Sequence, residues 1–139
     1  MKTIEDTIAT VTGAGSGIGK ATAVALAAAG ARVAATDLRL DSARETVDLI
    51  AGSGGEARAF ALDVADSVGV RHALAQIQHE LGNPSILVNN AGIAVGGQLS
   101  ERFETSAPVS TALGPRILRI CSIKAFMVWN NFSCRQHRF

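Results

Sequence analysis

Short apolar runs and longer amphipathic segments alternate along the chain from residue 8 to residue 88. The short runs are bounded by glycines or polar residues, which is typical of buried strands. The longer segments are typical of helices, the first because it is rich in alanine and lacks breakers, and the third because its apolar residues fall on one face. We predict strands at residues 8–12, 32–36, 57–62 and 86–88. We predict helices at residues 18–29, 41–52 and 67–81. This order implies a parallel sheet with right-handed crossovers and helices on both faces, so the predicted fold class is a three-layer α/β/α fold.

The helix ends have recognisable signals. Gly30 and Gly82 follow the first and third helices and predict their ends. Asp41 is predicted to cap the second helix, which directs Val47 and Ile50 toward the core.

Overall composition excludes several classes of protein. The 139 residues are 47% hydrophobic and 18% charged, with a formal net charge of +1, which argues against disorder and against nucleic acid or a membrane as partner. The uncharged stretch at residues 21–31 is too short to span a bilayer, and the start MKTIEDT does not have the build of a signal peptide. Cys121 and Cys134 make neither a disulfide framework nor a metal site. We therefore expect a cytoplasmic protein without a metal, and we leave its oligomeric state open.

Composition changes abruptly near residues 101–106. Residues 1–104 carry eight basic and twelve acidic side chains, whereas residues 105–139 carry five basic side chains and no acidic one. Five of the six aromatic residues also follow residue 102. We expect a half-domain at 1–104 and an atypical basic, aromatic, poorly ordered tail at 105–139. A reading frame lost near residue 105, or an exon joined out of register, accounts for such a break.

A glycine-rich segment joins the first strand to the first helix: Thr12-Gly-Ala-Gly-Ser-Gly-Ile-Gly19. Gly13 permits a tight turn, Gly17 lets backbone approach a pyrophosphate, and Gly19 lets the helix pack close to the sheet. The helix start then offers free N–H groups to phosphates. The spacing is G-x-x-x-G-x-G rather than the strict G-x-G-x-x-G, and a glycine turn without a ligand is the alternative.

Three further polar features follow the ends of the next strands. Asp37 can accept both hydroxyls of an adenosine ribose, or it is a solvated loop acid. Asp63, within Leu62-Asp63-Val64, can meet an adenine amino group, or it is a turn residue. In Asn89-Asn90-Ala91-Gly92, asparagine side chains can tie neighbouring strand ends together, although such a pair is usually only a turn.

Together these features resemble the classical short-chain dehydrogenase/reductase family. The residues that carry the likeness are TGAGSGIG at 12–19, Asp37, LDV at 62–64 and NNAG at 89–92, and the resemblance extends over residues 7–101. It implies a Rossmann-type fold and hydride transfer between a nicotinamide cofactor and an alcohol or carbonyl substrate. It also implies cofactor contacts at Gly13, Ser16, Gly17, Ile18, Gly19, Asp37, Asp63, Val64 and Asn90. Asp37 favours NAD over NADP, because a 2′-phosphate would meet its carboxylate.

The second half of the chain departs from that family. Family members use a serine and a Y-x-x-x-K motif, in which tyrosine transfers the proton. This chain contains no tyrosine. Gly114 to Ser122 resembles the family strand that ends in the catalytic serine, which makes Ser122 a candidate catalytic residue, or the segment is a chance apolar run in a tail of foreign origin. Because the second half departs from the family, we predict a sheet truncated after about four strands.

Two functions remain open. The chain is either an NAD(P)-dependent oxidoreductase of this family, or a catalytically inactive dinucleotide-binding fragment, including a truncated or frameshifted product. A third and less favoured hypothesis is that the basic tail contacts nucleic acid.

Overall fold

A computed structural model describes residues 4–92 and 119–122 of the chain. Its five strands are β1 (Ile8–Thr12), β2 (Arg32–Asp37), β3 (Ala57–Ala61), β4 (Ile86–Asn89) and β5 (Arg119–Ser122). Its helices in the described residues are α1 (Gly17–Ala28), α2 (Leu40–Gly52) and α3 (Ser67–Glu80). All strand pairs are parallel, and the strand order is β3-β2-β1-β4-β5.

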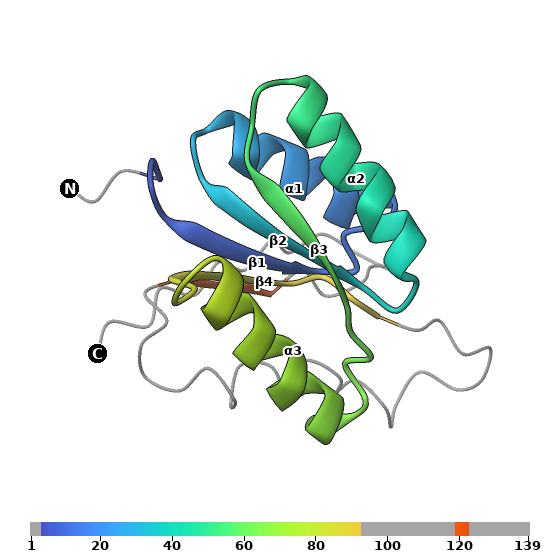
Figure 1. Cartoon of the computed structure of the whole chain (residues 1–139). Coiled ribbons are helices and arrows are strands. Elements are labelled where there is room, and N and C mark those ends of the chain that lie inside the picture. Colours follow the sequence, from blue (N-terminus) through green and yellow to red (C-terminus); the bar gives the residue numbers. More distant parts are fainter. Residues whose placement is uncertain (1–3, 93–118, 123–139) are drawn as a thin grey trace.

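Helices cover the two faces of this sheet in separate layers (Figure 1). Side chains alternate along each strand, so neighbouring residues join different cores. In β1, Ile8 packs in the core under α3, whereas Ala9 and Val11 pack in the core under α1 and α2. The predicted three-layer α/β/α fold is confirmed.

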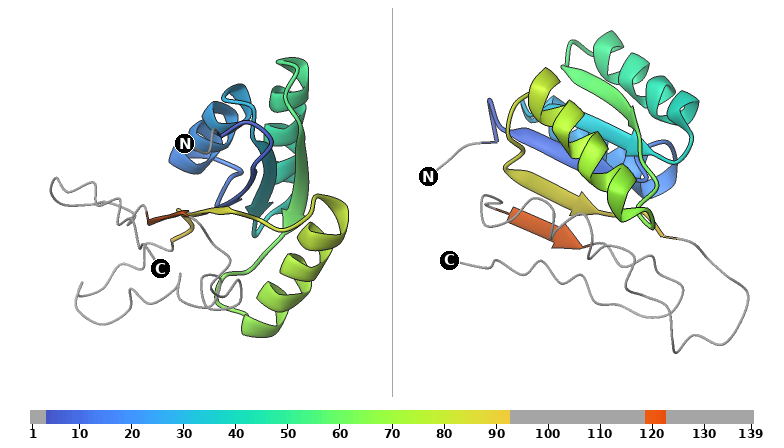
Figure 2. Two further views of the ribbon diagram at one scale, coloured as in Figure 1. Left: turned by 90° about the vertical axis from the view of Figure 1, so that its left-hand side faces the viewer. Right: turned by 60° about the horizontal axis from the view of Figure 1, so that its bottom comes forward.

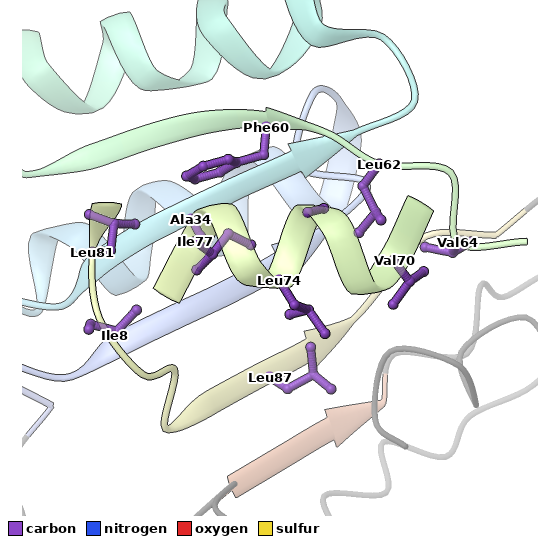
Figure 3. Packing of buried hydrophobic residues seen from close by; sticks show 11 residues of the cluster. Ile8, Ala34, Phe60, Leu62, Val64, Val70, Leu74, Ile77, Leu81 and Leu87 are labelled. Carbon is purple, nitrogen blue, oxygen red and sulfur yellow. The ribbon is translucent and has the colours of Figure 1, made fainter. Parts of the chain in front are cut away.

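The core under α3 is built from one face of that helix. Val70, Leu74 and Ile77 are buried at the helical spacing that the sequence predicted, and they pack with Phe60 and Leu87 of the sheet (Figure 3). The helix begins after Asp66, whose carboxylate accepts a hydrogen bond from the N–H of Val68 at 3.0 Å. Such a cap satisfies one of the amides that a helix start leaves without a partner.

The prediction for the start of α2 was wrong. Arg39 is the residue that precedes the helix, and Asp41 lies in its first turn, where it pairs with Arg44 at 3.1 Å. The reason lies in Asp37, whose Oδ1 accepts from the N–H of Arg39 at 3.0 Å and turns the chain early. As predicted, Ile50 is buried and Val47 is packed against the same core.

The sheet has one strand more than the four expected. Residues 119–122 form β5, which runs beside β4 with Asn89 opposite Ser122 (Figure 2). The rest of the predicted tail at 105–139, and the composition break at 101–106, lie outside the described residues.

The strand order reverses at β1. From β1 the chain crosses through α1 to β2 on one side, and it returns from β3 through α3 to β4 on the other. Ligands of such sheets bind in the crevice where the two connections diverge, at the carboxyl ends of the strands. The segments that follow β1, β2 and β4 meet there.

Candidate functional site

The segment after β1 makes a tight turn at Gly13. The φ angle of Gly13 is +66°, in the left-handed region that glycine adopts without strain. The next residue, Ala14, then donates its N–H to the carbonyl oxygen of Thr36 in β2 at 2.9 Å. The predicted turn is confirmed, and the loop leaves β1 in the direction of β2.

Gly19 brings helix α1 against this turn. A Cβ atom at Gly19 would fall onto the carbonyl oxygen of Gly13 and lie 2.7 Å from that carbonyl's carbon atom. It would also fall onto the side-chain nitrogen of Asn90. Only glycine fits here without displacement, which confirms the close packing predicted from the sequence.

Gly17, in contrast, faces open space. Its φ angle is +53°, and a Cβ atom there would meet nothing within 4 Å. Ser16 precedes the helix without using its side chain as a cap, and Ser16, Gly17 and Ile18 are all exposed. The first-turn amides of a helix have no partner within it, so this end of α1 presents N–H donors and the positive end of the helix dipole to a ligand.

Asp37 lies next to the glycine-rich loop. Its Oδ2 accepts from the N–H of Gly15 at 2.9 Å and its Oδ1 from the N–H of Arg39 at 3.0 Å. The side chain is half-buried. A carboxylate offers about four acceptor positions, so two remain for hydroxyl groups of a ligand. The two amides fix the orientation of the carboxylate before any ligand arrives.

Asn90 ties the end of β4 to the end of β1. Its side-chain nitrogen donates to the carbonyl oxygens of Thr12 at 3.1 Å and Gly13 at 3.2 Å. The hydroxyl of Thr12 in turn accepts from the backbone N–H groups of Asn90 and Ala91, both at 3.0 Å. The predicted link between strand ends is confirmed.

After β3, the N–H of Leu62 donates to the backbone carbonyl oxygen of Asp37 at 2.9 Å, whereas no hydrogen bond within the described part of the chain joins Asp63 or Val64 to this cluster. The carboxylate of Asp63 accepts from the N–H of Ala65 at 2.9 Å, which is the turn role that the sequence left open. Val64 is buried in the core under α3, so only its backbone is available to a ligand. The cofactor contacts predicted for both residues stay predictions.

The sequence analysis assigned no structural role to three residues in or beside the loop. Gly15 is packed so closely that a Cβ atom would lie 2.5 Å from the Cβ of Ser42 and 2.8 Å from Oδ2 of Asp37. Thr12 supplies the hydroxyl that holds the chain after β4. Thr46, from α2, bonds to the loop from the other side. Thr12 and Gly15, the second glycine of the segment, belong to the motif at 12–19, whereas nothing in the sequence marked Thr46.

Comparison with known proteins decides the family. A family model described as short chain dehydrogenase matches residues 7–113. This chain belongs to the short-chain dehydrogenase/reductase family, whose members are oxidoreductases that use NAD(P). The D-threitol dehydrogenase of Mycolicibacterium smegmatis is 45% identical over 91 residues, which cover 66% of this chain and 35% of that relative.

Solved structures of the family have the same fold. A hydroxysteroid dehydrogenase from Escherichia coli matches with a TM-score of 0.78 at 28% identity, over 86% of this chain and 58% of its own. A metagenomic short-chain oxidoreductase in complex with NADP matches with a TM-score of 0.77 at 27% identity, over 91% of this chain and 65% of its own. The chain spans well under two thirds of the length of the curated relative that it matches.

Other site types find no support in residues 4–92 and 119–122. No group of three potential metal ligands gathers within these ranges. Nor does any helix described there have the length and apolar character needed to cross a membrane. Ser122 lies at the end of β5, opposite Asn89, and its catalytic role stays a prediction.

Proposed function

We propose that this chain binds NAD along the carboxyl ends of β1, β2 and β4. The pyrophosphate would lie over Gly17 at the start of α1, where the backbone is open and amide donors are available. The adenosine ribose would donate its hydroxyls to Asp37. The observation that carries this proposal is the carboxylate of Asp37, held by two amides beside the loop.

Asp37 also underlies the proposed preference for NAD over NADP. A 2′-phosphate would replace the hydroxyl nearest to this carboxylate. Two like charges about 4 Å apart repel by about 4 kcal/mol at the dielectric constant of a protein surface. Arg39, two residues after Asp37, is exposed, and its positive charge would offset part of this repulsion. The metagenomic short-chain oxidoreductase was solved with NADP, so a relative of this chain binds the phosphorylated cofactor.

Hydride transfer to or from an alcohol or carbonyl is the chemistry that the nicotinamide supplies when bound. The reaction also needs a proton donor, and the 139 residues contain no tyrosine. General acid–base catalysis of this kind contributes about 10²–10⁴-fold to a rate. A serine at position 122 orients an oxygen but transfers a proton poorly. We therefore propose that the polypeptide itself binds dinucleotide and turns over no substrate at the rate of an intact family member.

Titration calorimetry with NAD and NADP tests the cofactor proposal. We expect tighter binding of NAD, and we expect Asp37→Ala to weaken NAD and to narrow the difference between the two cofactors. Asp48→Ala removes an exposed carboxylate from the neighbouring helix α2 and serves as the charge-matched control. Equal affinities in the unaltered chain, or a tighter NADP, would refute the preference.

Absorbance of the reduced nicotinamide tests the absence of turnover. Secondary alcohols and ketones are offered with NAD or its reduced form, and D-threitol is included because the relative from Mycolicibacterium smegmatis is named for it. We expect no steady change in absorbance. Steady turnover that disappears in Asp37→Arg would overturn the proposal and would favour the hypothesis that the chain is an active NAD(P)-dependent oxidoreductase.

A further inference from the structure

Thr46 lies outside every segment that the family motifs mark, yet it contacts the glycine-rich loop. It sits in the middle of α2 and is fully buried. Its hydroxyl oxygen lies 2.8 Å from the carbonyl oxygen of Ala14 and 3.3 Å from that of Ser42. The bond to Ala14 spans 32 positions of the chain, so α2 and the loop are joined directly.

The hydroxyl has only one proton, and two features assign it to Ala14. The distance to Ala14 is the shorter of the two. The carbonyl oxygen of Ser42 is also the normal acceptor for the helical N–H four residues later, which is that of Thr46 itself. Ala14 is buried, and Thr46 is the only donor to its carbonyl oxygen among the described residues. A buried carbonyl oxygen without a donor costs free energy, so the bond from Thr46 stabilises the loop at Ala14.

Neighbouring contacts show what the bond holds in place. The N–H of Ala14 donates to Thr36 of β2, and the next N–H, that of Gly15, donates to the carboxylate of Asp37. Gly15 also packs directly against Ser42 of α2. The N–H of Ala14 is therefore held by β2 and its carbonyl group by α2. The Gly15 amide that orients Asp37 belongs to the same peptide unit as that carbonyl group.

We infer that Thr46 is a positioning residue of the dinucleotide site, which fixes Ala14 and thereby the Gly15 amide that orients the carboxylate of Asp37. This inference rests on the proposed binding of NAD. Thr46 itself touches no ligand in this arrangement. Its loss loosens the loop and the ribose acceptor together, because one peptide unit connects them.

Two substitutions separate the hydroxyl from the methyl group of Thr46. Thr46→Val keeps the packing volume and removes the hydroxyl, whereas Thr46→Ser keeps the hydroxyl and removes a methyl group. A residue that acts only by packing would tolerate valine better than serine. A residue that acts through its hydrogen bond would show the reverse order.

Amide hydrogen exchange in the chain without dinucleotide gives the first readout. The amides of Ala14 and Gly15 report on the loop, and the amide of Val33, bonded to Glu56 at 3.0 Å between β2 and β3, reports on the sheet. In Thr46→Val we expect Ala14 and Gly15 to exchange about 3- to 10-fold faster relative to Val33, as the loss of one hydrogen bond implies. Thr46→Ser should stay within about twofold of the unaltered chain.

Titration calorimetry with NAD gives the second readout. We expect Thr46→Val to raise the dissociation constant of NAD by about 3- to 10-fold and Thr46→Ser to restore most of the affinity. Ile77→Val is the control, because it weakens the core under α3 without contacting the loop. It should change neither the ratio of exchange rates nor the affinity.

The outcomes distinguish the positioning role of Thr46 from the proposed binding of NAD. Unchanged exchange of Ala14 and Gly15 in Thr46→Val overturns the inference, whether or not NAD binds. A weaker effect of valine than of serine also overturns it, because that order indicates packing. No NAD binding by the unaltered chain overturns the proposed function and the positioning role with it, even if the exchange rates respond.

Discussion

Replacement of Gly19 by alanine tests the packing of α1 against the loop most directly. The new methyl group would fall onto the carbonyl oxygen of Gly13 and the side-chain nitrogen of Asn90. Overpacking of this kind costs about 1–3 kcal/mol, and displacement of Asn90 from Gly13 loses a hydrogen bond of about 1 kcal/mol. Alanine in place of glycine within a helix raises the free energy of unfolding by about 0.5–1 kcal/mol. We expect the free energy of unfolding to fall by about 2 kcal/mol.

Urea denaturation followed by circular dichroism measures this change, and Gly52→Ala is the matched control. Gly52 is also helical, lacks a positive φ angle, and has nothing within 4 Å of a Cβ position. The same substitution there should stabilise the chain by about 0.5 kcal/mol. Equal stability of the two variants, with unchanged denaturant dependence, would refute the claim that only glycine fits between α1 and the turn.

Two further predictions concern polar groups near the site. Asn90→Ala removes the donors to Thr12 and Gly13 and should lower the free energy of unfolding by about 1–3 kcal/mol in the same urea assay. An unchanged value would show that solvent replaces both bonds. Thr10→Val should be neutral or stabilising by up to about 1 kcal/mol, because the buried Thr10 hydroxyl has no partner in the described part of the chain. Thr12→Val should instead lower the free energy of unfolding, since the Thr12 hydroxyl takes part in three hydrogen bonds. A Thr10→Val variant less stable than Thr12→Val would contradict these hydrogen-bond assignments.

Local signals in the sequence were sufficient for the elements of the fold. Short β-branched runs predicted β1 and β4, and helical spacing predicted the buried face of α3 from Val70 to Leu81. The roles of Gly13 and Gly19 were also predictable, because a turn and a close approach each leave a glycine in the chain. Such features depend on neighbours in sequence or on a single small residue.

The parts that sequence analysis missed depend on contacts between distant residues. The start of α2 was misplaced because the side chain of Asp37 turns the chain at Arg39. Thr46 and Gly15 contact their partners across 32 and 22 positions, and no local pattern marks such pairs. The fifth strand falls within a segment whose basic composition favoured a tail, although its apolar run was visible.

The contacts of the loop explain why its glycines depart from the strict G-x-G-x-x-G spacing. After Gly13 the chain passes over β2, where Ala14 bonds to Thr36 and Gly15 bonds to Asp37, before it returns to α1. The residues between Gly13 and Gly17 are needed for this detour. A shorter connection would carry the chain directly from β1 into the helix and leave Asp37 without the amide that orients it. The longer spacing thus places the open backbone at Gly17 and the carboxylate of Asp37, at the end of β2, beside the same loop, which is the arrangement that the proposed NAD site uses.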